Sequence, residues 1–399
     1  MPERRYDIDW LRVLVMLAVF FFHCACFFDH STWILNNAER SIVADVFTGW
    51  FSIWFMPLFF LLSGFGSWYS LRSRSSGQYL SERVKRLLVP LYTVGLFLIN
   101  PPQDYFWNFS NLGFRGTFWE NLSHYFSRLG HFSFTQPAGL LPVPFHGHLW
   151  FLQFLFLISL VALPLLRYLR SEQGLHLIDT LAGWCHRQGG IFFFLIPVLL
   201  IRISLRSVSF PGLYTWADFL EFLVFFVIGY ILPADSRFTE SIKKHGWTCL
   251  ILGIISSWVV SYYVFGLGYR PGGTPFSLTF VLFETVWSIC RWSWILYFLS
   301  LGAKDLNVNN KVLAYSSEAV LPFYILHHTI IVCVGWFVIR WNIGILPKFL
   351  IIVVTSFAFI MVMYELLVKP FNGVRFLFGM RPRKKTSGTP TLRSEGTAA

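Results

Sequence analysis

One apolar segment of this chain carries two residues that can do chemistry, Arg12 and His23, in the stretch DIDWLRVLVMLAVFFFHC. They are eleven residues apart, which on an α-helix is three turns plus roughly 20°, so both side chains project from the same face. The separation along the helix axis is about 16 Å. Asp9, one turn before Arg12, is placed to pair with it. Imidazole is the side chain best suited to move a proton near neutral pH, so the pattern predicts a fixed cation and a proton acceptor on one line. Snorkelling of Arg12 to the membrane surface and an interhelical hydrogen bond of His23 are the structural alternatives.

A second pair of basic residues, Arg83 and Arg86 in SERVKRLLVP, lies one helical turn apart. Two guanidinium groups at this spacing form a natural clamp for phosphates. The excess of basic residues on the cytoplasmic side of membrane proteins explains either residue equally well.

Further histidines occur in GHLWFL, which holds His148, and in LPFYILHH, which holds Tyr324, His327 and His328. Ionisable and polar residues are costly within apolar spans, and the chain accumulates them. We therefore expect some of the following residues to line a shared polar cavity: Arg12, His23, His146, His148, Gln153, Glu221, Glu284, Arg291, His327 and His328. The chain has no Gly-rich phosphate loop, no G-x-S-x-G and no zinc-type histidine pair.

The elements that must position these residues are membrane helices. The 399 residues are 55% hydrophobic and 13% charged, with a mean hydropathy of +0.57, which indicates a polytopic membrane protein. The fold class predicted is therefore all-α, with about ten transmembrane helices around a polar cavity. The predicted spans are 10–28, 50–69, 87–99, 149–166, 191–205, 219–232, 247–265, 278–301, 320–339 and 349–368.

The distribution of charge sets the expected orientation. Lys and Arg fall between the apolar spans, and they concentrate on one side if the N-terminus is cytoplasmic, so both termini are predicted to be cytoplasmic. This distribution, rather than nucleic-acid binding, explains the net charge of +12. The six cysteines lack metal-ligand spacing. Residues 1–380 are expected to form one membrane domain, and 381–399 a disordered basic cytoplasmic tail.

In combination, these motifs resemble the integral-membrane acyltransferase family 3. Arg12 and His23 are similar to its Arg-x10-His signature, Arg83 and Arg86 to its Arg-x-x-Arg, and HLWFL and FYILHH to its other recurring segments, over roughly residues 5 to 380. The segments HSTWILNNAE and MYELLVKPFNGVRFLFGMRP are similar to members that succinylate periplasmic glucans. The resemblance implies transfer of an acyl group, succinyl or acetyl, from cytoplasmic acyl-CoA to a glycan hydroxyl on the outer face of a bacterial inner membrane.

The resemblance also suggests roles for the residues. His23 is expected to be the general base or a transient acyl carrier, with His327, His328 and Tyr324 assisting it. Arg12, Arg83 and Arg86 are expected to hold the phosphates of CoA. Contacts to the glycan are expected from His148, Trp150, Asp29 and His30. We expect no metal and no permanently bound cofactor, with acyl-CoA as co-substrate and the glycan acceptor and the lipid bilayer as partners.

A proton-coupled transporter or flippase is the competing interpretation, because intramembrane His, Glu and Arg are also what a proton relay needs. The sequence lacks the internal repeat and the paired broken helices typical of that class.

Overall fold

The computed structural model describes residues 5–145, 147–206, 214–269 and 274–383, and the regular elements within these ranges are all helices. The α-helices are α1 (Tyr6–Ala25), α2 (Ile42–Ser73), α3 (Ser76–Arg83), α4 (Asn100–Asn111), α5 (Phe118–Ser127), α6 (Trp150–Tyr168), α7 (Glu172–His186), α8 (Leu195–Leu205), α9 (Trp216–Ile231), α10 (Ser236–Ser261), α11 (Leu278–Asp305), α12 (Lys311–Val338), α13 (Ile345–Met363) and α14 (Asn372–Leu377). Short 3₁₀ and π segments join or extend them: η1 (Val84–Leu88), η2 (Leu91–Ile99), η3 (Pro137–Leu140), η4 (Gly147–Leu149), η5 (Gly190–Phe194), η6 (Leu232–Ala234), η7 (Tyr262–Gly266) and η8 (Tyr364–Val368). The all-α fold class is confirmed.

Seven helices within the described residues are long and apolar enough to cross a membrane. They are Tyr6–Ala25, Ile42–Ser73, Gly147–Tyr168, Trp216–Ala234, Ser236–Gly266, Lys311–Val338 and Ile345–Val368. Each of the ten predicted spans is largely helical, but the count of ten is not confirmed. The spans outside the seven are 87–99, which lies in η1 and η2, 191–205, which forms η5 and the short α8, and 278–301 in α11.

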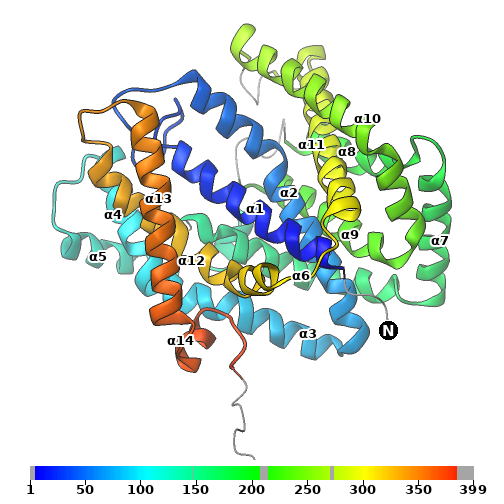
Figure 1. Ribbon diagram of the computed structural model, residues 1–399, viewed down its shortest axis with the longest axis horizontal. Helices are drawn as coiled ribbons and strands as arrows, with labels where there is room; N and C mark the ends of the chain where they lie inside the picture. The colour runs from blue at the N-terminus through cyan, green and yellow to red at the C-terminus, as the bar shows by residue number, and fades with distance from the viewer. Residues whose placement is uncertain (1–4, 146, 207–213, 270–273, 384–399) are drawn as a thin grey trace, which may run out of the picture.

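Helix α1 lies in the middle of the bundle (Figure 1). It packs against α2 and α11 on one side and against α12 and α13 on the other, while α10 and α11 form a long pair at the periphery. This central place explains how α1 presents one polar residue to α2 and another to α12.

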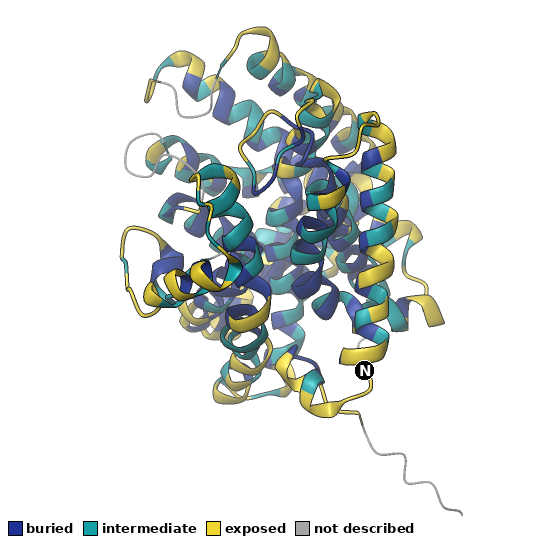
Figure 2. Ribbon diagram, turned by 90° about the vertical axis from the view of Figure 1, so that its left-hand side faces the viewer, coloured by how far each residue is buried: buried dark blue, intermediate teal, exposed yellow. Residues whose placement is uncertain are grey.

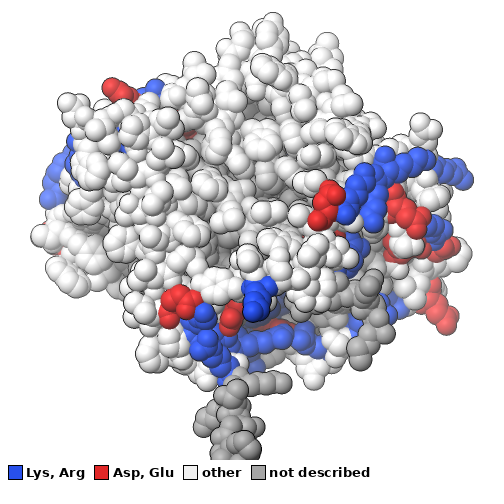
Figure 3. Space-filling view, viewed as in Figure 1, with Lys and Arg blue, Asp and Glu red and all other residues white. Residues whose placement is uncertain are grey.

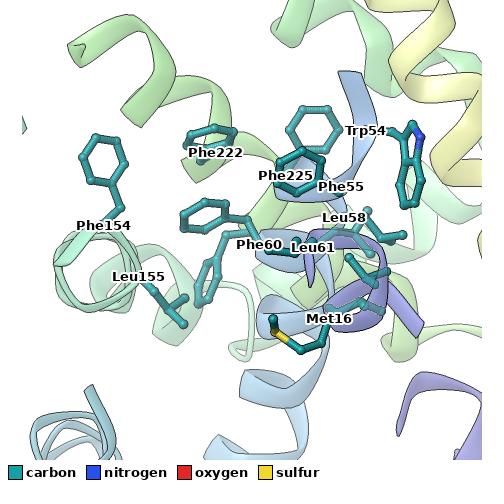
Figure 4. Packing of buried hydrophobic residues seen from close by; sticks show 14 of the residues in the cluster. Met16, Trp54, Phe55, Leu58, Phe60, Leu61, Phe154, Leu155, Phe222 and Phe225 are labelled. Atoms are coloured by element: carbon teal, nitrogen blue, oxygen red, sulfur yellow. The ribbon is translucent and has the colours of Figure 1, made fainter. Parts of the chain in front are cut away.

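Helix α2 and helix α9 pack unusually closely, because small residues line their contact. A Cβ atom on Gly64 would overlap the carbonyl oxygen of Phe226, and one on Gly229 would overlap that of Leu61. An aromatic layer fills the space beside this contact, with the rings of Phe60 and Phe222 stacked at 4.5 Å (Figure 4). Close backbone approach at small residues is the usual way to associate helices in lipid, where no hydrophobic force holds them together.

The helix that begins at α3 continues without a break through η1 and η2 into α4, from Ser76 to Asn111. It starts at a capping box in which Ser75 and Gln78 bind each other's backbone N–H groups. The two π segments flank Pro90, which has no N–H to give to the helix. One continuous helix therefore connects the Arg83 and Arg86 turn with the polar residues of α4.

The surface is that of a membrane protein. Apolar side chains point outward along α13 and α10, including Leu346, Leu350, Val354, Trp247 and Trp258. Buried residues concentrate in the interior and exposed ones at the rim (Figure 2). In the space-filling view, charged side chains gather in the lower part, on the right-hand side and at the upper left, and a broad uncharged surface lies between them (Figure 3).

Two predictions about the ends of the chain remain untested. Nothing in the structure tests the orientation of the termini or the division into 1–380 and 381–399. Of the tail, residues 381–383 are described, and 384–399 lie outside the described residues.

Candidate active site

Four histidines from three separate elements meet at one place: His23 near the end of α1, His148 in η4, and His327 and His328 in α12. The ring centroids of His23 and His328 are 4.5 Å apart and those of His23 and His327 are 5.1 Å apart. His148 lies 4.8 Å from His328 and 4.9 Å from His327. His148, His327 and His328 are buried, whereas His23 keeps partial exposure. We call these four residues the histidine cluster.

The carbonyl oxygen of Tyr324 determines which ring nitrogens carry hydrogen. His327 Nδ1 lies 2.6 Å from this oxygen, and since a carbonyl only accepts, Nδ1 must carry the hydrogen. In neutral His327, Nε2 is then the acceptor, and it lies 3.1 Å from His23 Nδ1. His23 therefore donates from Nδ1, and its Nε2 holds a lone pair when the ring is neutral. The arrangement leaves Nε2 as the nitrogen of His23 that can accept a proton.

His148 is held by the same helix from the other side. Its Nε2 lies 3.1 Å from the carbonyl oxygen of Tyr324 and 3.3 Å from that of Ile325, so Nε2 carries hydrogen and Nδ1 accepts. The amide nitrogen of Gln103 lies 3.3 Å from Nδ1 and also donates to Thr329 Oγ1 at 2.8 Å. Both nitrogens of His148 are thus used within the protein, which favours an orienting role for this ring.

His328 has a buried ring nitrogen that no hydrogen bond in the described part of the chain uses. Its side chain is 3% exposed, and no described residue gives Nδ1 a hydrogen-bond partner. The ring lies edge-on to His23 and is stacked on His148. An unpaired polar atom in a buried place beside a base is available to a reacting group.

The hydroxyl of Tyr324 donates to the backbone oxygen of His148 at 2.5 Å, so it joins α12 to η4. Trp33, in the loop after α1, packs beside the histidine cluster, with its ring 6.2 Å from that of His23 and 5.3 Å from that of His328. Asn111 on α4 holds this loop by donating to the backbone oxygen of Trp33 at 3.1 Å.

Three residues predicted to contact the acceptor lie outside the cluster. Asp29 is buried and accepts hydrogen bonds from the backbone and the hydroxyl of Ser31. His30 is exposed and pairs with Asp45 at 2.7 Å. Trp150 packs among aromatic side chains of the core, with its ring 5.1 Å from that of Phe154.

The predicted cationic residues come together around the start of the helix Ser76–Asn111. Arg12 pairs with Asp9 at 3.0 Å and donates to the backbone oxygen of Leu62 at 3.0 Å. Arg83 donates to Ser67 Oγ at 2.6 Å. Arg12 and Arg86 each experience the positive charge of Arg83, so the three guanidinium groups form one basic region. Lys and Arg side chains gather at the lower edge of the molecule, near α3 and the grey tail (Figure 3).

The remaining buried charges form a separate network. Glu221 and Glu284 pair with Arg202 at 3.1 and 2.5 Å, and Arg291 pairs with Glu221. Arg291 Nε also donates to the backbone oxygen of Ile53 at 2.6 Å, so the network joins α8, α9, α11 and α2. Because every cation in it meets a carboxylate, it holds helices together rather than forming part of the histidine cluster.

Two other residues predicted to line a polar cavity are Gln153 and His146. Gln153 donates to the backbone oxygen of Leu141 at 2.7 Å, and His146 lies outside the described residues.

Two hollows in the structure lie away from the histidine cluster. An apolar groove of about 460 Å³ lies between α1 and α13, and a second hollow of about 350 Å³ lies beside Arg5 and α10. Neither is lined by His23 or Arg83, so the polar cavity around the spans stays a prediction. Within the described residues, no group of three or more His, Cys, Asp or Glu is arranged to hold a metal ion.

The motifs in the sequence did not predict roles for Trp33, Gln103 or Thr329. Two features of the sequence could have indicated these residues: Thr329 directly follows His327 and His328, and Gln103 lies in a polar stretch after two prolines. Nothing in the sequence indicated that Trp33 folds back over His23.

Comparison with known proteins decides the family. A family profile described as an acyltransferase domain matches residues 5–365. The chain belongs to this acyltransferase family. It is also similar over its full length to the glucans biosynthesis protein C of Salmonella agona (strain SL483) and of Salmonella enteritidis PT4 (strain P125109). Each is 22% identical over 399 residues, covering 99% of this chain and 98% of the relative. No solved structure matches the chain. The resemblance found in the sequence is therefore confirmed.

Proposed function

We propose that this acyltransferase moves a succinyl or acetyl group from cytoplasmic acyl-CoA to a hydroxyl of an extracytoplasmic glycan, with His23 as the residue that acts on the reacting atoms. The observation that carries the proposal is the hydrogen bond from His23 Nδ1 to His327 Nε2, with His23 on the same helix as Arg12. The name of these relatives, which refers to glucans, supports a glycan acceptor.

In the proposed reaction, His23 Nε2 takes the proton of the acceptor hydroxyl while the oxygen attacks the thioester carbonyl. The tetrahedral intermediate collapses, the carbon–sulfur bond breaks, and the proton passes from His23 to the departing CoA sulfur. An N–H at His328 Nδ1 would stabilise the negative oxygen of the intermediate. A route in which His23 Nε2 first accepts the acyl group itself uses the same geometry.

The donor would approach from the basic region. Arg12, Arg83 and Arg86 would hold the phosphates of CoA, and the pantetheine arm would extend along α1 toward His23, about 16 Å from Arg12 by helical rise. This assignment gives the multi-pass protein a cytoplasmic donor side and an opposite acceptor side, in what we propose is a bacterial inner membrane.

The test is thiol release from succinyl-CoA and acetyl-CoA by purified protein with periplasmic glucans, with acylated glucan detected by mass spectrometry. His23→Ala is expected to lower the rate about 10²–10⁴-fold, the usual contribution of general acid–base catalysis. His131→Ala is the matched control, because His131 is an exposed histidine outside the cluster and should leave the rate unchanged. An active His23→Ala protein would refute the role of His23, and absence of transfer by the unaltered protein with either donor would refute the proposed function.

A further inference from the structure

A carboxylate occupies the centre of a group of arginines beside the Arg83 turn. Glu82 pairs with Arg74 at 2.8 Å, with Arg381 at 2.8 Å and more loosely with Arg86 at 3.9 Å. The three arginines come from three segments of the chain: the end of α2, η1, and the segment after α14. We call Arg74, Arg86 and Arg381 with Glu82 the outer arginine group.

The charges of this group do not balance. Three guanidinium groups face one carboxylate, and Arg86 also experiences repulsion from Arg83 and Arg12. Burial alone would raise the pKa of the Glu82 carboxyl, but the hydrogen bond from Arg381 and the charges of Arg74 and Arg86 lower this pKa below its ordinary value. Glu82 is therefore ionised at neutral pH, and the group still carries excess positive charge.

The chain holds Arg381 in this place. The backbone oxygen of Arg381 accepts a hydrogen bond from Arg375 Nε at 2.9 Å, and Met380 N donates to the backbone oxygen of Arg375 at 2.8 Å. Gly379 has a φ of +69° and lies against η1, where a Cβ atom would come within 2.8 Å of the backbone oxygen of Arg86. A side chain at Gly379 would disturb both the turn at Gly379 and its contact with Arg86. The C-terminal segment therefore packs closely against the turn that holds Arg83 and Arg86.

Two arginines of the outer arginine group, Arg86 and Arg381, are the more exposed ones, whereas Arg74 is 32% exposed. The Arg12 side chain is 33% exposed, that of Arg86 is 51% and that of Arg381 is 70%. CoA carries its negative charge at two places: a pyrophosphate attached to the pantetheine arm, and a separate phosphomonoester on the ribose. The pyrophosphate must lie closer to the thioester, so the exposed Arg86 and Arg381 are left for the phosphomonoester, together with Arg74, which Glu82 holds beside them.

We propose that Arg74, Arg86 and Arg381 form a binding subsite for a phosphomonoester, the 3′-phosphate of the CoA ribose, and that Glu82 is an internal anion which this phosphate displaces. The subsite rests on the proposed use of acyl-CoA. Guanidinium groups bind phosphate through paired, charge-assisted hydrogen bonds, and a phosphomonoester replaces one negative charge by nearly two. Glu82 keeps the arginines oriented until the donor arrives and weakens the binding of smaller anions.

The test compares the affinities for CoA and for 3′-dephospho-CoA, measured by calorimetry on the full-length protein in a neutral detergent. Arg381→Gln is expected to weaken CoA binding about tenfold and to leave 3′-dephospho-CoA binding within about twofold. Glu82→Gln, which keeps the size of the side chain, is expected to tighten CoA binding more than 3′-dephospho-CoA binding. Lys85→Ala is the matched control, because it removes a positive charge from the same turn and should affect both ligands equally.

The outcomes separate the subsite from the proposed function. If the unaltered protein binds neither ligand, the use of acyl-CoA is wrong; if it binds both equally, or if Arg381→Gln weakens both equally, only the subsite is wrong. Tighter CoA binding by Glu82→Gln supports displacement, and weaker binding overturns it.

Nanodiscs with and without phosphatidic acid test whether a lipid supplies the phosphomonoester. If the protein binds this lipid through Arg381 and shows no preference for the 3′-phosphate of CoA, the lipid and not CoA is the ligand of the subsite.

Discussion

At the scale of single residues, the backbone oxygen of Tyr324 orients two rings of the histidine cluster, because it accepts a hydrogen bond from each. It receives His327 Nδ1–H and His148 Nε2–H, and these two bonds fix both tautomers. In the proposed reaction, His327 would act only through His23, as a positioning residue.

We predict different effects from two substitutions of His327. His327→Leu removes the acceptor for His23 Nδ1–H, so kcat should fall about 10²-fold while the affinity for acyl-CoA stays the same. His327→Gln offers an amide oxygen in nearly the same place and should recover part of this loss. Steady-state kinetics with a full pH profile would check this, since only the Leu variant should shift the acidic limb that reports His23. Equal losses in both variants, with an unchanged profile, would mean that His327 serves packing alone.

Part of the site could be predicted at this scale. Arg12 and His23 follow from periodicity and from the cost of polar groups in an apolar helix. The contribution of Gln103 could not be predicted, because it depends on the tautomer of His148, which depends in turn on α12. The proposed roles of Asp29, His30 and Trp150 remain predictions about the acceptor, and the structure places none of them in the cluster.

At the scale of elements, the close packing of α2 gives Arg12 its position. Arg12 donates to the backbone oxygen of Leu62, and its Nη2 lies where Gly66 leaves room. A Cβ atom on Gly66 would come within 2.9 Å of that nitrogen, which belongs to the far end of a flexible side chain.

Gly66→Ala should therefore move the Arg12 guanidinium and leave the fold intact. We expect the affinity for acyl-CoA to fall about tenfold with unchanged thermal stability. Gly64→Ala is the contrasting variant: its Cβ would overlap the rigid backbone of α9, and it should destabilise the protein by about 3 kcal/mol. Thermal unfolding and ligand binding measured on both proteins would distinguish the two effects, and a Gly66→Ala protein with full affinity would contradict this account of Arg12.

The helices themselves were largely predictable, since long apolar runs without charge have few alternatives. The limits appear where helices are interrupted or polar. The region 87–99 forms π segments around Pro90 because the missing N–H disturbs the hydrogen-bond ladder, and this cannot be read from hydropathy. In α11, Glu284 and Arg291 lower the apolar character, and their partners Arg202 and Glu221 become neighbours only after folding.

At the scale of the whole molecule, orientation in the membrane is the main untested prediction. The positive-inside rule places both termini and the Arg83 turn in the cytoplasm. A membrane-impermeant maleimide applied to intact spheroplasts should therefore label Leu112→Cys and should label Ser73→Cys only after lysis, since both positions are exposed and lie on opposite sides in this orientation. Background labelling should be small, because the native cysteines are buried or half-buried. The reverse pattern would invert the proposed donor and acceptor sides.

In the proposed reaction, the indole of Trp33 would affect how much of the acyl donor is lost to hydrolysis. A base next to a thioester would activate water as readily as a sugar hydroxyl. Each activated water would hydrolyse one donor molecule without acylating the acceptor. Because Trp33 packs against His23 and His328, this hydrolysis should be slow until an acceptor replaces the solvent. Trp33→Ala should raise acceptor-independent CoA release about tenfold relative to transfer. We therefore expect the loop after α1 to affect the fraction of donor that is transferred, rather than the turnover rate.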